Sequence, residues 1–228
     1  MKRIILIGLM AIVAICANSR EFLSIDWGSI KNEATTDPQH IKDLVARLSA
    51  EKLDTTLTYA ERALAFYGQS YLTRDKEELE VRQMRQHFQS QDLEQCLACA
   101  KHILETNPLN LDALRMAGNA LLAMSKDPLK WPDVTEQDAK HYFNLTFRIY
   151  NTIAMTGDGS AEHPFCVTKV SDEYNFMRVY LNLWKYSSQA LIGNCDVFTL
   201  EESSEYYLQP KIYFDVTRVL EIEMMRFP

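Results

Sequence analysis

The stretch DLEQCLACAKHILETNPLNLDALRMAGNALLAM, residues 92–124, decides the fold of this chain. Apolar residues in its first half recur at spacings of three and four residues, which is typical of one face of an α-helix. The pattern stops at Asn107-Pro108, and a second helix follows. The two apolar faces consist of Leu93, Cys96, Leu97, Ala100, Ile103 and Leu104, and of Leu111, Leu114, Gly118 and Leu121. The stretch therefore predicts two packed helices joined by a short turn.

The same stretch resembles the junction between two tetratricopeptide repeats, which are helical hairpins with a period of 34 residues. If Pro108 closes one repeat, Cys96 takes the small-residue position, and Gly118 takes the glycine position inside the next first helix. The likeness covers about one and a half repeats and ends where the Trp131-Pro132 loop breaks the period. It implies helical hairpins with an inner face that can hold a partner.

Asp112, Arg115 and Asn119 lie on the expected inner face of the second repeat. In peptide-binding members, a basic residue and an asparagine at two of these positions help to clamp a C-terminal carboxylate. The resemblance thus makes these three residues candidates for binding a protein or peptide. The alternative is a solvated helix face without a ligand.

The segment CLACAKH contains Cys96, Cys99 and His102, which suggests a redox, haem or metal site. Haem attachment needs the histidine directly after the second cysteine, and here two residues intervene. Redox cysteine pairs lie at a helix N-terminus, where the dipole stabilises a thiolate, whereas this pair is in mid-helix. We therefore expect cysteines that pack as small apolar residues.

Helical signals extend through the first two-thirds of the chain. Asp37-Pro38 is a helix start, Gly68 is a candidate helix end, and Thr135 with Asp138 resembles a capping box. Besides the two helices of the opening stretch, we expect helices near residues 38–48, 56–67, 73–88 and 135–153.

Strand signals appear after Gly157. Gly193-Asn194 separates two β-type runs and predicts a two-residue hairpin turn. The expected strands are residues 165–170, 184–192, 195–200 and 211–216; a helix starts at Ser171, and residues 217–227 fit either a helix or a strand. The fold class is therefore α+β and mostly α. We expect a tetratricopeptide-like helical region over residues 20–156 and a smaller β-containing region over residues 157–228, packed as one unit.

The chain opens with MKRIILIGLMAIVAICANS, residues 1–19, which reads as a secretory signal peptide. Lys2 and Arg3 precede a twelve-residue apolar run, which is too short for a lasting membrane anchor. Ile15 before Cys16 disfavours a lipoprotein. No second long apolar run follows. We therefore expect an exported protein, periplasmic or associated with the outer membrane, with no stable membrane span once the signal is removed.

The net charge excludes one broad class of partner. The whole chain has 24 Lys and Arg against 31 Asp and Glu, a formal charge of −7. Without residues 1–19, which contain Lys2 and Arg3, the balance is 22 against 31, or −9. An acidic surface repels phosphate backbones, so nucleic-acid binding is not expected.

The segment GDGSAEHPFCVTKVSDEYNFM, residues 157–177, contains residue types found in hydrolases and metal sites. Asp158, His163 and Asp172, together with Asp215, are the candidate catalytic or metal-binding residues of an alternative enzyme hypothesis. The segment has no HxH or HExxH spacing, so no metal or cofactor is expected. Glycines and aspartates also cluster in turns, and a structural turn explains most of the pattern. A third interpretation pairs Cys166 with Cys195 in a disulfide between neighbouring strands.

Four segments together resemble a family of exported Bacteroidetes proteins, domain-of-unknown-function family 4919. They are GDGSAEHPFCV, VSDEYNFM, a hairpin entering CDV, and KIYFDVTRVLE, and the resemblance extends to FYGQSYL. The resemblance implies export and one coherent unit, and it brings no catalytic residues. The favoured hypothesis is a non-enzymatic binding or scaffolding protein with a protein or peptide partner. The alternative is a periplasmic hydrolase or metal-dependent enzyme.

Overall fold

The computed structural model describes residues 21–73 and 77–226. The predicted signal peptide and Cys16 lie outside the described residues. Within these ranges, no helix combines the length and the apolar character that a membrane crossing requires.

Three helices form the start of the described chain. Asp26 and Asp37 act as N-caps, and their carboxylates accept the backbone N–H groups of Ser29 and His40. Gly68 lies inside the third helix, where a Cβ would come within 2.7 Å of Ile41 Cδ1. The prediction that Gly68 ends its helix is therefore wrong, because the glycine permits close packing of two helices. These elements are α1 (Trp27–Thr36), α2 (Pro38–Ser49) and α3 (Tyr59–Thr73).

Two successive helical hairpins follow. Their helices are α4 (Glu78–Gln89), α5 (Leu93–Thr106), α6 (Leu111–Met124) and α7 (Glu136–Ala154). Helix α6 packs against α4, α5 and α7. The first helices of the two hairpins, α4 and α6, therefore contact each other. Gly118 of α6 faces the ring of Phe143, and a Cβ there would come within 2.8 Å of it. This close approach explains the glycine within the apolar face.

The last part of the chain builds a small mixed sheet. Its order is β1-β4-β3-β2; β1 runs parallel to β4, and the other pairs are antiparallel. Gly193 in the β2–β3 turn has a φ of +61°, as the predicted hairpin requires. The elements are β1 (Phe165–Cys166), α8 (Val170–Asn175), the π-helix η1 (Phe176–Tyr180), β2 (Tyr186–Ile192), β3 (Cys195–Leu200), β4 (Lys211–Asp215) and α9 (Thr217–Arg226).

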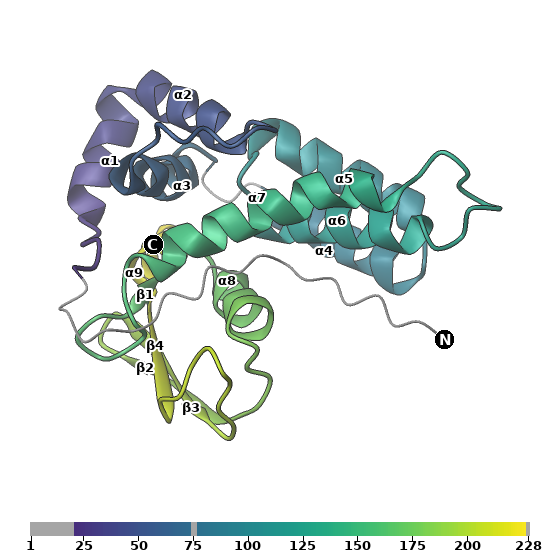
Figure 1. The fold of residues 1–228 in the computed structure, drawn as a ribbon. Helices are drawn as coiled ribbons and strands as arrows, with labels where there is room; N and C mark the ends of the chain where they lie inside the picture. Colours follow the sequence, from purple (N-terminus) through teal and green to yellow (C-terminus); the bar gives the residue numbers. More distant parts are fainter. Residues whose placement is uncertain (1–20, 74–76, 227–228) are drawn as a thin grey trace.

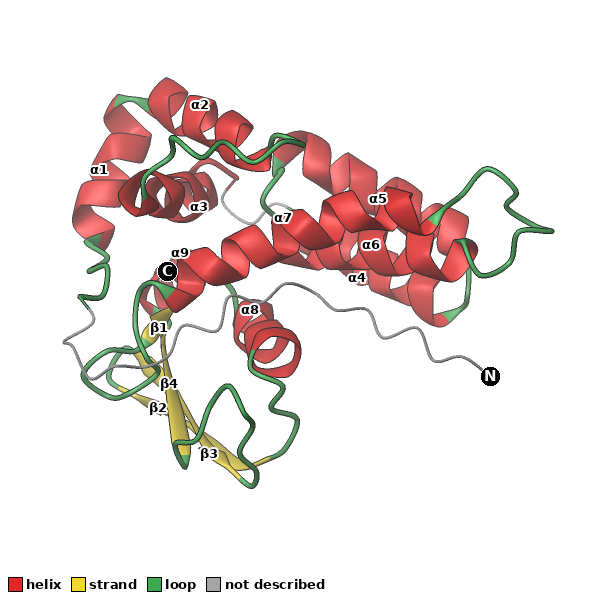
Figure 2. Ribbon diagram, in the orientation of Figure 1, coloured by secondary structure: helices red, strands yellow, loops and turns green. Residues whose placement is uncertain are grey.

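Helix α8 lies between the helical hairpins and the sheet (Figure 1). Figure 2 shows that helix dominates and that the strands gather at one end of the molecule. The larger apolar core includes Leu44 and Tyr150 from the helices and Phe176 and Phe214 from the C-terminal part. A second core, around Met84, Cys96 and Ala117, lies within α4, α5 and α6. The predicted class, α+β and mostly α, is confirmed.

The structure corrects one expectation for the C-terminal part and decides another that the sequence left open. The predicted strand over residues 165–170 covers only Phe165–Cys166, because Thr168 and Lys169 instead donate hydrogen bonds that start α8. Residues 217–226 form a helix rather than a continued strand.

Candidate functional site

A cleft of about 340 Å³ opens where helices α4, α6 and α9 meet the start of α8. Of the residues predicted for the inner face of the repeat, the cleft includes Asp112. The lining comprises Glu78, Val81, Arg82, Arg85, Asp112, Thr168, Lys169, Val170, Ser171, Val219, Ile222 and Glu223. Its volume is at the lower end of the range for small-ligand sites.

Asp112 lines the inner end of the cleft and is only 2 % exposed. Its carboxylate accepts hydrogen bonds from Arg85 Nη2 at 2.8 Å, Ser171 Oγ at 2.7 Å and Asn175 Nδ2 at 3.3 Å. Burial raises the pKa of this carboxyl, but the Arg85 charge and the hydrogen bonds from Ser171 and Arg85 outweigh burial and leave it below the ordinary value. Asp112 thus fixes side chains from α4 and α8 around one buried charge.

Lys169 stands at the side of the cleft formed by the start of α8. Its Nζ lies 3.6 Å from Oε2 of the buried Glu77, whose Oε1 accepts a hydrogen bond from Asn107 Nδ2 at 2.9 Å. Behind it, Asp172 accepts hydrogen bonds from Thr168 Oγ1 at 2.9 Å and from Lys169 N at 3.1 Å. Burial raises the pKa of Asp172 to about 7. Lys169 is therefore held at two points, by Glu77 at its side chain and by Asp172 at its backbone N–H.

Val81, Val219 and Ile222 supply apolar surface to the cleft. The last two belong to α9, which is anchored by the buried Arg218: its Nη2 donates to Ser70 O at 2.8 Å. The charged lining residues balance in number, with Arg82, Arg85 and Lys169 against Glu78, Asp112 and Glu223. The arrangement suits a ligand that presents apolar surface together with positively and negatively charged groups.

Of the three predicted binding residues, the structure places only Asp112 in the cleft. Arg115 and Asn119 lie further along α6 and do not line it. The basic residue that donates a hydrogen bond to Asp112 in the cleft is Arg85, which comes from α4, one hairpin earlier. The repeat pattern could have indicated Arg85, since α4 is the first helix of the preceding hairpin.

The four residues of the enzyme hypothesis have separate local roles. Asp158 and His163 are exposed on one turn, where the N–H groups of Asp158 and Gly159 both donate to His163 O at 3.0 Å. Asp172 is buried at the start of α8, and Asp215 accepts a hydrogen bond from Trp27 Nε1 at 3.1 Å.

These four residues form no metal-binding group. Among residues 21–73 and 77–226, the clustered ligand atoms of three or more His, Cys, Asp or Glu residues are those of Glu33, Asp37 and His40 alone. Two of those three side chains are exposed, and His40 Nδ1 lies 2.8 Å from Glu33 Oε1. Exposed groups of this kind are common without a metal, so the cluster identifies no metal centre.

Cys166 and Cys195 are both free, and strand β4 lies between them. Each is paired in register with Asp215, one from β1 and the other from β3. Strands are spaced about 4.8 Å apart, so Cα atoms two strands apart exceed the reach of a disulfide. The disulfide considered from the sequence is therefore not formed. Burial raises the pKa of Cys166 well above that of an ordinary thiol.

The CLACAKH segment packs as predicted. Cys96 is fully buried in the second core, and burial raises the pKa of its thiol to about 11. His102 is exposed and lies near two carboxylates, those of Glu80 and Glu105. A protonated, enclosed thiol is unsuited to redox or metal chemistry, so the interpretation of Cys96 as a core residue is confirmed.

A family described as a domain of unknown function, DUF4919, matches residues 27–225. The chain belongs to the DUF4919 family. The match includes both the helical hairpins and the sheet, so the cleft lies within the family's domain. Neither the comparison with curated proteins nor the comparison with solved structures gave a match.

Proposed function

We propose that this DUF4919 protein is a non-enzymatic binding protein that holds a segment of a protein or peptide in the cleft between α4, α6, α8 and α9. The observation that carries the proposal is the cleft itself, which combines apolar surface, balanced charges and a buried anchor at Asp112. The cleft is lined by α4 and α6, the first helices of the two hairpins, and helical repeats bind partners on the concave surface of stacked units.

The polar groups of the cleft are held in place without a ligand. Asp112 fixes both Arg85 and Ser171, so neither side chain has to be ordered when a partner binds. Preorganisation of this kind lowers the entropic cost of binding. An apolar side chain of the partner would pack on Val81 and Val219, and its backbone or polar groups would meet Arg85 and Ser171.

Selection of peptides from a random displayed library against residues 21–228 tests the proposal. Selected peptides should lose about tenfold or more in affinity for Arg85→Glu, since a lost charged hydrogen bond costs about 1.5–3 kcal/mol. Because Arg85 also holds Asp112, Arg82→Glu provides a second cleft variant that leaves that contact intact. Arg178→Glu is the matched control, since Arg178 is exposed on η1 and does not line the cleft. Peptides that bind all four proteins equally would refute the cleft as the binding site.

The basic start and apolar run of residues 1–19 support export of this binding protein to the periplasm or the outer membrane. Cell fractionation with N-terminal sequencing of the mature chain tests this part. A cytoplasmic protein that retains Met1 would contradict it.

A further inference from the structure

Each of the three basic side chains that line the cleft is paired with a carboxylate of the protein itself. The pairs, with their N–O distances, are Arg85–Asp112 at 2.8 Å, Arg82–Glu78 at 3.7 Å and Lys169–Glu77 at 3.6 Å. Glu77 is only 3 % exposed and does not belong to the lining, whereas Asp112 and Glu78 do. The lining carboxylates and cations balance in number, so the pairing of Lys169 with Glu77 leaves one lining carboxylate over.

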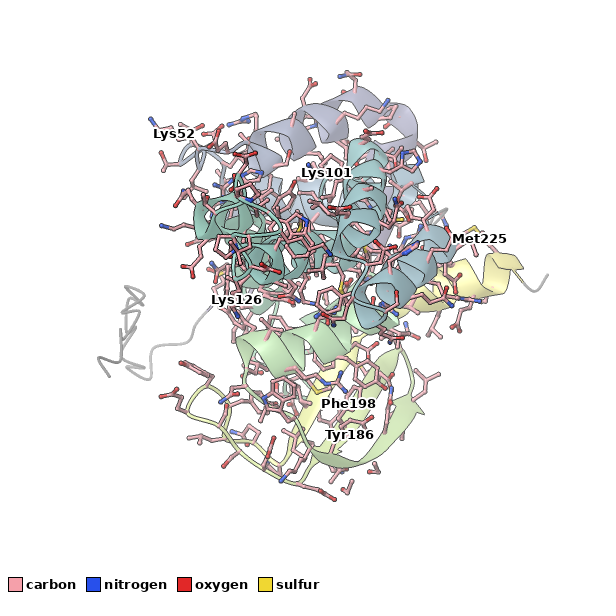
Figure 3. The ribbon with its side chains drawn as sticks, turned by 90° about the vertical axis from the view of Figure 1, so that its right-hand side faces the viewer. Lys52, Lys101, Lys126, Tyr186, Phe198 and Met225 are labelled. Carbon is pink, nitrogen blue, oxygen red and sulfur yellow. The ribbon has the colours of Figure 1, made fainter. Side chains whose placement is uncertain are left out.

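That carboxylate belongs to Glu223 of α9. Within the part of the chain that the structure describes, it takes part in no hydrogen bond or ion pair. Glu221 of the same helix, by contrast, is paired with both Arg218 and Lys31. Figure 3 shows α9, marked by the label of Met225, at the side of the molecule, and Glu223 lies two residues before Met225 in the sequence. The cleft therefore has an exposed, uncompensated negative charge at its α9 wall.

The spacing of Val219 and Glu223 adds a geometric condition. They are four residues apart on α9 and both line the cleft, so they lie on one face of the helix, about 6 Å apart along its axis. In an extended segment, the side chains of residues i and i+2 point to the same side and are roughly 6.5 Å apart. A partner residue that packs on Val219 therefore places the side chain two positions away at Glu223.

We propose that the partner of the cleft is an extended segment with a lysine or arginine two positions from an apolar residue, and that the cation pairs with Glu223. This partner chemistry rests on the binding function proposed above. A basic side chain completes the charge pairing of the cleft, whereas an acidic one at the same position meets a second carboxylate and is repelled. Arg85 uses Nη2 for Asp112, so its other N–H groups can donate to backbone carbonyl groups of the partner.

Selection of random heptapeptides displayed on phage against residues 21–228 tests this inference. Selected peptides should be richer in lysine and arginine than the unselected library. A selected peptide should lose up to about fivefold in affinity for Glu223→Gln, as expected for a partly exposed ion pair, and about tenfold or more for Glu223→Lys. The same peptide with its basic residue changed to glutamate should bind Glu223→Lys more tightly than it binds the wild-type chain.

Glu162→Lys is the matched control. It makes the same change in net charge, and Glu162 is exposed and does not line the cleft, so the affinity should change less than about twofold. Equal losses for Glu162→Lys and Glu223→Lys would overturn the inference, because net charge alone would explain them. Peptides that lose affinity for Arg85→Glu or Arg82→Glu and yet bind Glu223→Lys like the wild type would overturn it too, while leaving the proposed function intact. Peptides whose affinity no cleft variant changes would refute the proposed function and this inference together.

Discussion

Glu173 has an unusual environment for an acidic side chain. It is fully buried in α8, and neither of its carboxylate oxygens has a hydrogen-bond partner among the described residues. Burial, with the Asp196 carboxylate nearby, raises the pKa of Glu173 to about 9. Between pH 4.5 and 9 the folded chain therefore retains a proton that the unfolded chain releases, and stability falls as the pH rises.

We expect Glu173→Gln to stabilise the protein at neutral pH, because the amide is uncharged in both states. The ordinary pKa of a glutamate is 4.5, and each pH unit from there to pH 7 contributes to the difference between the two variants. The gain in the free energy of unfolding at pH 7 is therefore up to about 3 kcal/mol. The gain should fall toward zero at pH 4, where glutamate is protonated in both states. Urea denaturation at pH 4 and pH 7 measures it, with the exposed Glu162→Gln as the control. An equal effect of Glu173→Gln at both pH values would contradict the ionisation argument.

The sequence predicted the start of α8 but not the burial of its acids. Ser171 with Asp172 and Glu173 reads as a helix start whose acids favour the positive end of the dipole. Periodicity over so short a helix does not define a buried face, and the covering groups come from β3 and α6. Cys96 was predictable because it belongs to a long apolar stripe. His163 was assigned correctly to a turn before a strand, since Pro164 restricts its backbone.

Helix α9 depends on one buried cation. Arg218 is 1 % exposed; its Nη2 donates to Ser70 O at 2.8 Å, and its guanidinium lies 4.0 Å from the centre of the Tyr71 ring. Val219 and Ile222 of the same helix line the cleft. The anchor therefore positions one wall of the proposed binding site.

We expect Arg218→Ala to loosen α9, because it removes the contacts to α3 and leaves the buried Ser70 carbonyl without this donor. The loss should be about 2–4 kcal/mol in the free energy of unfolding. Hydrogen exchange of residues 217–226 should increase more than that of α5. Glu223→Ala, at an exposed position of α9, is the control and should leave exchange nearly unchanged. Unchanged protection of α9 in Arg218→Ala would show that its apolar contacts suffice.

Elements with long periodic patterns were the predictable ones. Helices α5 and α6 and the β2–β3 hairpin follow directly from residues 92–124 and from Gly193-Asn194. Helix α1 was missed because only Ile30 and Ala34 of its ten residues are buried, which gives no clear stripe. Strand β1 is two residues long, and its extent depends on pairing with β4, which lies far away in the sequence.

The cleft is lined by residues that lie far apart in the sequence, in α4, α6, α8 and α9. Arg85 and Ser171 meet at Asp112 although they lie 27 and 59 residues away from it in sequence. Of the three α6 residues that the repeat resemblance indicated, only Asp112 lines the cleft. The resemblance could not supply α8 or α9, because no repeat pattern includes the chain after Gly157. The residues of the site that the sequence analysis missed thus come from α4, as Arg85 does, and from the C-terminal part.

The same junction determines how the molecule unfolds. The larger core draws side chains from both sides of Gly157, and Tyr67 Oη of α3 donates to Cys166 O of β1 at 2.9 Å. Two further hydrogen bonds cross the junction: Cys166 N donates to Thr156 Oγ1 at 2.9 Å, and Arg218 Nη2 donates to Ser70 O at 2.8 Å. Because independent domains each have their own core, this shared core leads us to propose that the regions on either side of Gly157 fold as one unit.

We therefore expect residues 21–228 to unfold in one cooperative transition, with coincident midpoints in far-UV and near-UV circular dichroism. The fragment 21–156 should keep much helix but lose near-UV signal, because it exposes the core side chains that the C-terminal part covers. The matched comparison is the full chain cut by protease after Gly159 and left associated, which should keep near-native packing. A fragment 21–156 that unfolds sharply at the midpoint of the full chain would contradict this expectation. The helices up to α7 would then form an independent domain, and α8 and α9 would only add a wall of the cleft to it.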